Sequence, residues 1–388
     1  MTKVFAGVLF LFLHGIVSAQ VVALRAENWV FRPGAVEFVP AAGGSTGTAN
    51  GSTGAANGST GTATGPSMKI IARNEVITLK NTDFTDGTIE FDDQPTDRGF
   101  ASFYFRWQDS LENECFYFRT QRAGHPDDID AVQYTPTIKG INCWDIMGHY
   151  QGNASFQQQA PNHVKLVISG RQMRVYVNSQ EQPTLEIPRL EGNTTHGTLG
   201  FEGNSIISNV VIRPGRVDGL SPGEGTDPTS NDPRYIRHWQ VTQPDSIPKN
   251  IDFSYDLMPG KQTVWAPVGA ERRGLVNLTR LYGTSPSRRI VWLKTTLHSE
   301  GVRKCQLRLG FSDEVWILIN GHWLYVDKNY YGQPIAKDPD GRLSIENATI
   351  VLPLQAGDNE LLVGVGNNFY GWGIAARLDD LHGISLEK

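Results

Sequence analysis

Residues 100–121 read FASFYFRWQDSLENECFYFRTQ, and two short segments within this stretch decide the fold class. Over residues 100–108 and 114–121, aromatic side chains recur at every second position. That period is typical of a strand with one buried face. The polar residues 109–113 between the segments are typical of a turn. The stretch therefore predicts a β-hairpin with an aromatic core face.

The two faces of this predicted hairpin differ in chemistry. Phe103, Phe105 and Trp107 share one face of the first strand, and the second strand offers a matching apolar face with Phe116 and Phe118. We expect these rings to lie in the core. The opposite face carries Ser102, Tyr104 and Arg106 on the first strand, and Cys115, Tyr117 and Arg119 on the second.

An outer sheet face that carries tyrosine and arginine suits a sugar ligand. Aromatic rings can cover the apolar C–H faces of a pyranose, and guanidinium groups donate hydrogen bonds to its hydroxyls or to a carboxylate. The alternative is an ordinary solvated face whose side chains make cross-strand contacts. The candidate binding residues are Tyr104, Arg106, Tyr117 and Arg119, with Gln133, Tyr134, Trp144 and His149 as a possible rim.

The rest of the chain repeats this pattern of short strands. Residues 162–170 and 172–178 predict a hairpin that turns at Gly170. Asn320-Gly321, between EVWILI and HWLYVD, is the strongest hairpin signal and predicts a type I′ turn. No stretch keeps a period of 3.6 over about eleven residues. Frequent turns, with 41 Gly and 21 Pro, complete the prediction of an all-β chain with few or no helices after the N-terminal segment.

The length and composition predict two domains in tandem, both β-sandwiches of the jelly-roll type. A chain of 388 residues is long enough for two or three domains. Residues 214–233, PGRVDGLSPGEGTDPTSNDP, are dense in Pro, Gly and Asp and are predicted to be a linker. The predicted domains are therefore residues 20–213 and residues 234–388.

A low-complexity run lies inside the first of these domains. Residues 44–65 contain three near-identical copies of a seven-residue unit built on GSTG, without charge or large apolar side chains. Strand-like segments flank it, GAVEFV before and MKIIA after. We therefore expect residues 42–66 to form an expanded hairpin loop. Lengthening a loop from about 4 to about 26 residues costs only about 1.5–2 kcal/mol of closure entropy.

Residues 1–19 read as a secretory signal peptide. Lys3 precedes an apolar run from Val4 to Leu13, and small residues allow cleavage after Ala19. The run is too short to span a bilayer, and no later segment is long enough, so no transmembrane segment is expected. The prediction is a secreted, periplasmic or cell-surface protein. A net charge of −5 without a dense Lys/Arg cluster argues against a nucleic-acid partner.

An exported chain meets an oxidising compartment, where its three cysteines could pair. A Cys115–Cys143 disulfide would close a loop within the first domain and contribute about 3–4 kcal/mol. Cys305 alternates with Leu307 and Leu309, so we expect it to be a buried core thiol.

Three stretches of the first domain together resemble the concanavalin A-like lectin/glucanase sandwich. They are FRWQDSLENECFYFRTQ, HPDDIDAVQYTP and NHVKLVISGRQMRVYVN, and the nearest relatives are laminin G-like modules and 3-keto-disaccharide hydrolase-type domains. The second half, with FSDEVWILINGHWLYV and LQAGDNELLVGVGN, resembles the galactose-binding-like jelly roll. Both resemblances imply a carbohydrate ligand by analogy of fold.

The resemblance implies a position for catalytic carboxylates on one strand of the first domain. Laminarinase-type relatives carry Glu, Asp and Glu at alternate positions of one strand. Here Glu90 and Asp92 alternate, but Gln94 takes the third position, so the signature fails. Glu90 and Asp92 stay weak catalytic candidates, and the polar face of an ordinary strand is the competing interpretation.

Two loops offer further candidates. Asp127, Asp128 and Asp130 in HPDDID could supply oxygen ligands to Ca²⁺, although acidic loops are often simply solvated. A second aromatic surface is expected from loops at one end of the second domain, or these rings instead plug its core. Its residues are Tyr330, Tyr331, Tyr370 and Trp372.

The leading hypothesis is an exported, non-catalytic protein that recognises a glycan or polysaccharide, with no required cofactor and with Ca²⁺ as an optional one. The first alternative is a glycoside-cleaving enzyme of the 3-keto-disaccharide hydrolase or lyase type. The second is a structural or adhesion module. Two buried, convergent carboxylates in one cleft would favour the enzyme, and an aromatic face without them would favour binding.

Overall fold

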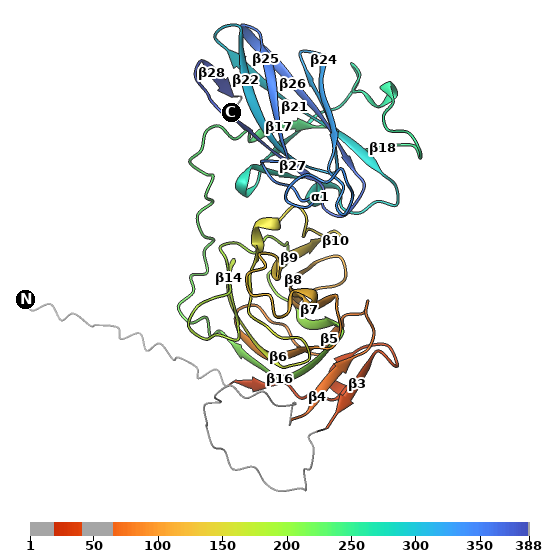
Figure 1. Cartoon of the computed structure of the whole chain (residues 1–388), viewed down its shortest axis with the longest axis vertical. Coiled ribbons are helices and arrows are strands. Elements are labelled where there is room, and N and C mark those ends of the chain that lie inside the picture. The colour runs from red at the N-terminus through yellow and green to blue at the C-terminus, as the bar shows by residue number, and fades with distance from the viewer. Residues whose placement is uncertain (1–18, 41–64, 387–388) are drawn as a thin grey trace, which may run out of the picture.

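The computed structural model describes residues 19–40 and 65–386, and nearly all of its regular elements are strands (Figure 1). The described residues contain one α-helix, α1 (Leu278–Tyr282). None of the described helices has the length and apolar character needed to cross a membrane. The structure therefore confirms the predicted all-β class. Short 3₁₀ turns lie at Ala26–Asn28, Thr120–Arg122, Gly148–Tyr150, Tyr255–Leu257 and Arg272–Gly274.

Strands from the first half of the chain form two antiparallel sheets. The first sheet has the order β14-β13-β12-β6-β16-β4-β3, with β1 on β16. Its strands are β1 (Gln20–Val21), β3 (Val36–Val39), β4 (Ser67–Ile70), β6 (Gly87–Pro95), β12 (Asn162–Ser169), β13 (Gln172–Val177), β14 (Leu185–Ile187) and β16 (Ser205–Pro214).

The second sheet contains the hairpin that was predicted from residues 100–121. Its order is β10-β9-β8-β7-β15-β5-β2, with β11 on β9. Its strands are β2 (Trp29–Val30), β5 (Ile77–Leu79), β7 (Phe100–Trp107), β8 (Asn113–Arg119), β9 (Val132–Ile138), β10 (Ile141–Asn142), β11 (Gln151–Gly152) and β15 (Thr198–Gly203).

The two sheets pack face to face, and we call them the N-terminal sandwich. The ring of Phe91 on β6 lies 4.8 Å from the ring of Phe103 on β7 and 5.1 Å from that of Phe201 on β15. Phe116 and Phe118 join the same core, as their alternation predicted. Each sheet is thus apolar toward the other and polar on its outer face.

Strands from the second half form a further pair of sheets, the C-terminal sandwich. The larger has the order β19-β17-β21-β26-β23-β24, with β18 and β28 on β21, and the smaller has the order β20-β27-β22-β25. The strands of the larger sheet are β17 (His238–Val241), β18 (Asp245–Ser246), β19 (Ala266–Gly269), β21 (Arg289–Ser299), β23 (Glu314–Ile319), β24 (His322–Lys328), β26 (Gly357–Asn367) and β28 (Ile384–Leu386). Those of the smaller are β20 (Leu275–Asn277), β22 (Arg303–Ser312), β25 (Ala348–Leu354) and β27 (Gly373–Leu378).

Three predicted hairpins are confirmed. Strands β12 and β13 pair antiparallel on either side of Gly170, whose φ is +52°. Asn320 and Gly321, with φ of +52° and +76°, connect β23 and β24, as a type I′ turn requires. The strands that flank the repeat, β3 and β4, also pair antiparallel. The repeat between them and the predicted signal peptide lie outside the described residues, apart from Gly65 and Ala19.

One feature of β7 departs from the predicted alternation. Against β15, Trp107 pairs with Thr198 and Tyr104 pairs with Gly200, so two residues of β7 oppose one of β15. Arg106 has a φ of +48° at this β-bulge. The bulge exchanges the faces of the last two residues of the strand. Trp107 therefore leaves the core face on which it was expected, and the Arg106 side chain turns into the interior, where it is 1% exposed.

The predicted disulfide is wrong, because Cys115 and Cys143 are free thiols on different sides of the second sheet. Cys115 lies on the outer face with Tyr104 and Tyr117, whereas Cys143 belongs to the core between the sheets. Cys305 is a buried thiol in the C-terminal core, as expected.

The described segment between the two sandwiches, residues 215–237, contains no strand, and the predicted linker falls almost entirely within it. It follows the N-terminal sandwich before it enters the C-terminal one (Figure 1). The carbonyl of Pro222 accepts the N–H of Arg171, and the N–H of Gly225 donates to the carbonyl of Pro188. Its main chain is therefore hydrogen-bonded to the body that it leaves.

Candidate functional site

A cleft of about 590 Å³ opens on the outer face of the second sheet and extends to the C-terminal sandwich. It is lined by residues of β7, β8, β9, β10 and β15, by loops of the N-terminal sandwich, and by one residue of the C-terminal sandwich. The lining residues are Arg73, Asn74, Asp97, Arg98, Gly99, Phe100, Ser102, Tyr104, Ser110, Cys115, Tyr117, Thr137, Gly140, Asn142, Trp144, Glu202, Gly203, Asn204 and Tyr370.

The floor of the cleft is the outer face that the alternation predicted. Tyr104 on β7 and Cys115 and Tyr117 on β8 form a small cluster on that face. The ring of Trp107 packs edge-on against that of Tyr104 at 5.1 Å, which the bulge makes possible. Burial is the main cause that raises the pKa of the Cys115 thiol. A raised pKa disfavours the reactive thiolate, so we assign this sulfur a structural part in the floor.

Glu202 supplies a carboxyl group to this floor, and sequence reasoning missed it. The Tyr104 hydroxyl donates a 2.6 Å hydrogen bond to Glu202 Oε2. Burial is the main cause that raises the pKa of Glu202 above its ordinary value. A signal was present, because Glu202 follows the core residue Phe201 on β15 and must therefore face outward.

A polar network under the floor fixes the position of Trp144. Arg119 Nη2 donates to the Tyr117 hydroxyl at 2.9 Å and to Gln133 Oε1 at 2.7 Å. Gln133 Nε2 in turn donates to the main-chain carbonyl of Trp144 at 2.7 Å. Arg119 is 5% exposed, also donates to the carbonyl of Asp130, and does not line the cleft, so it braces the floor residues from the side.

Aromatic side chains from both sandwiches meet at one end of the cleft. The Trp144 ring lies edge-on to Tyr331 at 4.7 Å and to Tyr370 at 5.9 Å. Phe369 stacks on Tyr331 and touches Tyr370, and the guanidinium of Arg342 lies 5.4 Å from the Trp144 ring centre. The structure thus joins residues that the sequence assigned to two separate surfaces.

The other end of the cleft is polar and open. Arg73 and Asp97 form an ion pair of 2.6 Å, and Asn204 donates a weak 3.4 Å hydrogen bond to the same carboxylate. Phe100 is 56% exposed, and its ring lies edge-on to Tyr117 at 5.4 Å. The cleft therefore has exposed rings at both ends and hydrogen-bonding groups between them.

Five residues predicted for binding do not line the cleft. Arg119 and Tyr331 lie against the lining residues Tyr117 and Trp144, whereas the other three lie elsewhere. Arg106 is held by the carbonyls of Thr85 and Gly170 and by Asp86, with donor–acceptor distances of 2.8–3.0 Å. Trp372 is 1% exposed in the C-terminal core, so the core-plug alternative is the correct one for it. Tyr330 is half-buried and donates its hydroxyl to Glu314.

The two rim candidates Tyr134 and His149 also lie elsewhere. Tyr134 is fully buried in the core, where its hydroxyl donates to Glu114 at 2.6 Å. His149 lines a separate cavity of about 280 Å³ between the two sandwiches.

The weak catalytic candidates belong to the other sheet of the N-terminal sandwich. Glu90 on β6 pairs with Arg213 at 2.7 Å. Asp92 contacts His163 Nδ1 at 2.8 Å and accepts a 2.6 Å hydrogen bond from Asn209. Neither carboxylate lines the cleft, so both form the polar face of an ordinary strand.

The acidic loop does not bring its three carboxylates together as ligands. Arg122 lies beside two of them, with ion pairs of 3.4 Å to Asp128 and 3.0 Å to Asp130, while Asp127 is exposed. In the described parts of the chain, no group of three or more His, Cys, Asp or Glu side chains is placed to hold a metal ion.

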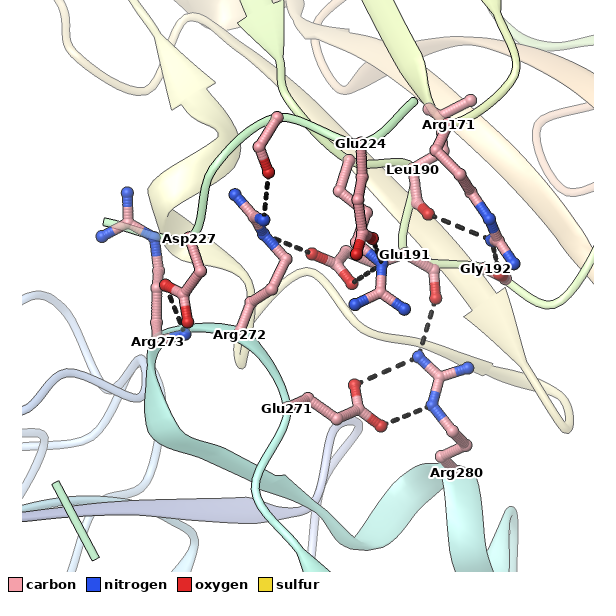
Figure 2. Close-up of polar contacts among 12 residues, drawn as sticks. Arg171, Leu190, Glu191, Gly192, Glu224, Asp227, Glu271, Arg272, Arg273 and Arg280 are labelled. Carbon is pink, nitrogen blue, oxygen red and sulfur yellow. Dashed lines mark hydrogen bonds and ion pairs between the residues drawn. The ribbon is translucent and has the colours of Figure 1, made fainter. Parts of the chain in front are cut away.

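Charged groups, most of them half-buried, connect the two sandwiches, as Figure 2 shows. Glu191, in the loop before β15, is 4% exposed and lies 3.7 Å from Arg272 Nε. Arg280 on α1 forms a bidentate pair with Glu271 and reaches across to the N-terminal sandwich. Arg272 also donates to the carbonyls of Gly225 and Thr226 in the connecting segment.

No protein-family model matches this chain, and neither does any curated protein. Among solved structures, the carbohydrate binding module CBM66 from Bacillus subtilis is similar at 14% identity and a TM-score of 0.29, covering 41% of this chain and 89% of that one. A Bacillus licheniformis β-glucanase is similar at 12% identity and a TM-score of 0.28, covering 48% of this chain and 100% of that one.

An anti-sigma factor domain-containing protein is similar over 80% of this chain and 81% of its own, at 9% identity and a TM-score of 0.25. With TM-scores of 0.25–0.29, these likenesses carry no conclusion about a ligand or an activity. The galactose-binding-like resemblance of residues 234–388 stays a prediction.

Proposed function

We propose that this chain binds an oligosaccharide or polysaccharide segment in the cleft on the outer face of the second sheet. The observation that carries the proposal is the convergence of Tyr104, Tyr117, Trp144 and Tyr370 with hydrogen-bonding groups in one cavity of about 590 Å³. Its volume lies within the roughly 300–1,000 Å³ range of pockets for small organic ligands.

The rings at the two ends of the cleft suit the apolar faces of sugar rings. Phe100 and Tyr370 are 56% and 45% exposed, so both offer uncovered ring surface. Trp144 is half-buried and held in place from below through Gln133. Rings that are already immobilised lose little side-chain entropy on binding, which favours affinity.

Polar groups between the rings suit the hydroxyls of a sugar. Asn74, Asn142 and Asn204 offer both donors and acceptors, whereas Arg98 and Glu202 offer charged ones. Both signs of charge are present, so the cleft is suited to a neutral glycan better than to a highly charged one.

The test is binding of the full chain to a glycan array and to soluble laminarin, levan, xylan and galactan, with calcium and with chelator. We expect retention of at least one of these glycans, lost in Trp144→Ala and Tyr370→Ala. Trp323→Ala is the matched control, because Trp323 is 39% exposed on β24 and does not line the cleft. Binding to none of the probes, or equal loss in all three variants, would contradict the proposal.

One observation favours a second function, the cleavage of a glycosidic bond. Glu202 combines a raised pKa with a place in the cleft, as a general acid requires. Cleavage also needs a second carboxylate across the bond, and Asp97, the other acid of the cleft, is exposed and paired with Arg73. Binding is therefore the better-supported function.

The two functions are separated by the fate of the glycan. Release of reducing ends from a retained polysaccharide by the wild type, and its loss in Glu202→Gln, would establish cleavage. Retention without product over the same period would leave recognition as the function.

A further inference from the structure

The loop that carries Tyr370 is held by carboxylates of both sandwiches. Asp313, on the C-terminal sandwich, accepts the N–H groups of Asn368 and Phe369 at 2.6 Å each. Asp145, on the N-terminal sandwich, accepts the N–H of Gly371 with its two oxygens at 3.0 and 3.1 Å. Tyr370 lies between these two anchors, so the position of its ring depends on both.

The contact between Asp145 and Gly371 requires a glycine. A Cβ atom at residue 371 would lie 2.4 Å from Asp145 Oδ1 and 2.9 Å from the Ile146 side chain. Such distances force the loop or the aspartate to move. The loop thus approaches the N-terminal sandwich as closely as its main chain allows.

Asp145 is also tied to a second loop of the C-terminal sandwich. Its main-chain carbonyl accepts the N–H of Leu343 at 2.9 Å, and its neighbour Trp144 lies against Arg342. The side chain is 2% exposed, and burial is the main cause that raises its pKa to about 7. The carboxyl group does not line the cleft, so it would act on binding through the residues that it holds in place.

We propose that Asp145 is a positioning residue for the cleft. Through Gly371 it sets the β26–β27 loop, residues 368–372, so that Tyr370 forms a wall of the cleft, and a bound oligosaccharide then contacts both sandwiches. This inference rests on the proposed function and adds that the C-terminal sandwich takes part in the same binding event.

The side chain of Asp145→Asn keeps the size of the aspartate but replaces one acceptor oxygen with an NH₂ group that cannot accept a hydrogen bond. We expect faster amide exchange in residues 368–372 and an affinity for the retained polysaccharide about tenfold lower. Asp93→Asn is the matched control. Asp93 is 3% exposed on β6, burial also raises its pKa to about 7, and it lies on the other sheet.

The experiment is hydrogen exchange by mass spectrometry on the full chains, with affinity measured for each soluble polysaccharide that the wild type retains. Faster exchange in residues 368–372 and weaker binding in Asp145→Asn, with neither in Asp93→Asn, support the proposal. Unchanged exchange in that loop, or faster exchange with unchanged affinity, overturns it while the proposed function stands. Failure of the wild type to bind any probe overturns both.

Gly371→Ala reaches the same contact from the other side. We expect it to speed amide exchange in the same loop and to weaken binding as Asp145→Asn does. The double variant should have an affinity no lower than that of the single variant that binds more weakly. Independent, multiplying losses would show that the two residues act separately, and would overturn the proposal.

Discussion

The guanidinium of Arg280 donates a 2.7 Å hydrogen bond to the main-chain carbonyl of Glu191 and so joins α1 to the N-terminal sandwich (Figure 2). The Glu191 carboxylate accepts a 2.7 Å hydrogen bond from the Tyr150 hydroxyl, and the main-chain N–H of Glu191 donates to the Tyr134 hydroxyl at 2.6 Å. The interface is therefore built on buried, charge-assisted contacts that continue into the core of the N-terminal sandwich.

Arg280→Ala should lower the free energy of unfolding by about 1.5–3 kcal/mol, because it leaves the carbonyl of the buried Glu191 and the half-buried Glu271 carboxylate without this donor. Urea denaturation measures the change. Arg174→Ala is the control, since Arg174 pairs with Glu186 where the side chains are 38% and 63% exposed, and should cost less than about 1 kcal/mol. Equal costs would show that the interface contact is no stronger than a surface pair.

Three buried carboxyl groups should contribute stability that is lost as the pH rises from about 4 to about 7. The pKa of Asp93 is about 7 in the folded chain, against an ordinary value of 3.8. The folded state therefore binds more protons than the unfolded state within this window, and its advantage is lost as the pH rises. Glu114 and Asp145, with pKa values raised to about 7, act in the same direction.

Asp93→Asn should reduce the difference in unfolding free energy between pH 5 and pH 8, because it removes one of these groups. Urea denaturation at the two pH values, in the wild type and the variant, measures that difference. An unchanged difference would mean that Asp93 ionises in the folded chain as it does in the unfolded one.

Tyr104→Phe should raise the pKa of Glu202 further, because the Tyr104 hydroxyl donates to the ionised carboxylate and favours it. The ¹³C chemical shift of the Glu202 carboxyl, followed against pH, measures the change. Tyr176→Phe is a suitable control, since Tyr176 lies on β13 of the other sheet. A lower or unchanged Glu202 pKa in Tyr104→Phe would contradict the geometry of the floor.

All three cysteines should react with an alkylating agent after unfolding without a reductant. In the native chain they should react slowly, because burial raises the pKa of the Cys115, Cys143 and Cys305 thiols. Peptide mapping under non-reducing conditions measures both. A Cys115–Cys143 bridged peptide would contradict the structure.

Shortening the connection between Val39 and Ser67 to about four residues should raise the free energy of unfolding by about 1.5–2 kcal/mol, since β3 and β4 are paired and closure entropy falls. Urea denaturation of the shortened chain measures this. A loss of stability would show that the connection makes contacts of its own.

Much of the fold could be predicted from local patterns. The alternation in β7 and β8 correctly placed Tyr104 and Tyr117 on the outer face, because two-residue periodicity and one buried face determine side-chain direction. The prediction that Arg106 lies on the outer face failed for a local reason. The positive φ of Arg106, +48°, belongs to a β-bulge that exchanges the faces on which Arg106 and Trp107 lie. No residue type in FASFYFRWQ predicts that bulge.

The site could be predicted only in parts. Trp144 and Tyr370 were each recognised as candidates, but their contact joins positions far apart in the sequence, and local patterns carry no such information. Glu202 faces Tyr104 because of the pairing of β15 with β7, and strand order cannot be read from one sequence. Trp372 was predicted on a binding surface but lies in the core, because a ring between glycines can occupy either place.

The cleft is also divided in the order of synthesis. Its floor comes from β7 and β8, whereas the loop with Tyr370 and Gly371 follows β26, so the ribosome makes one wall long after the floor. A nascent chain that has completed the N-terminal sandwich thus presents the floor without Tyr370. The complete cleft exists only once both sandwiches have folded and docked, so the proposed binding would be a late event in the life of each chain.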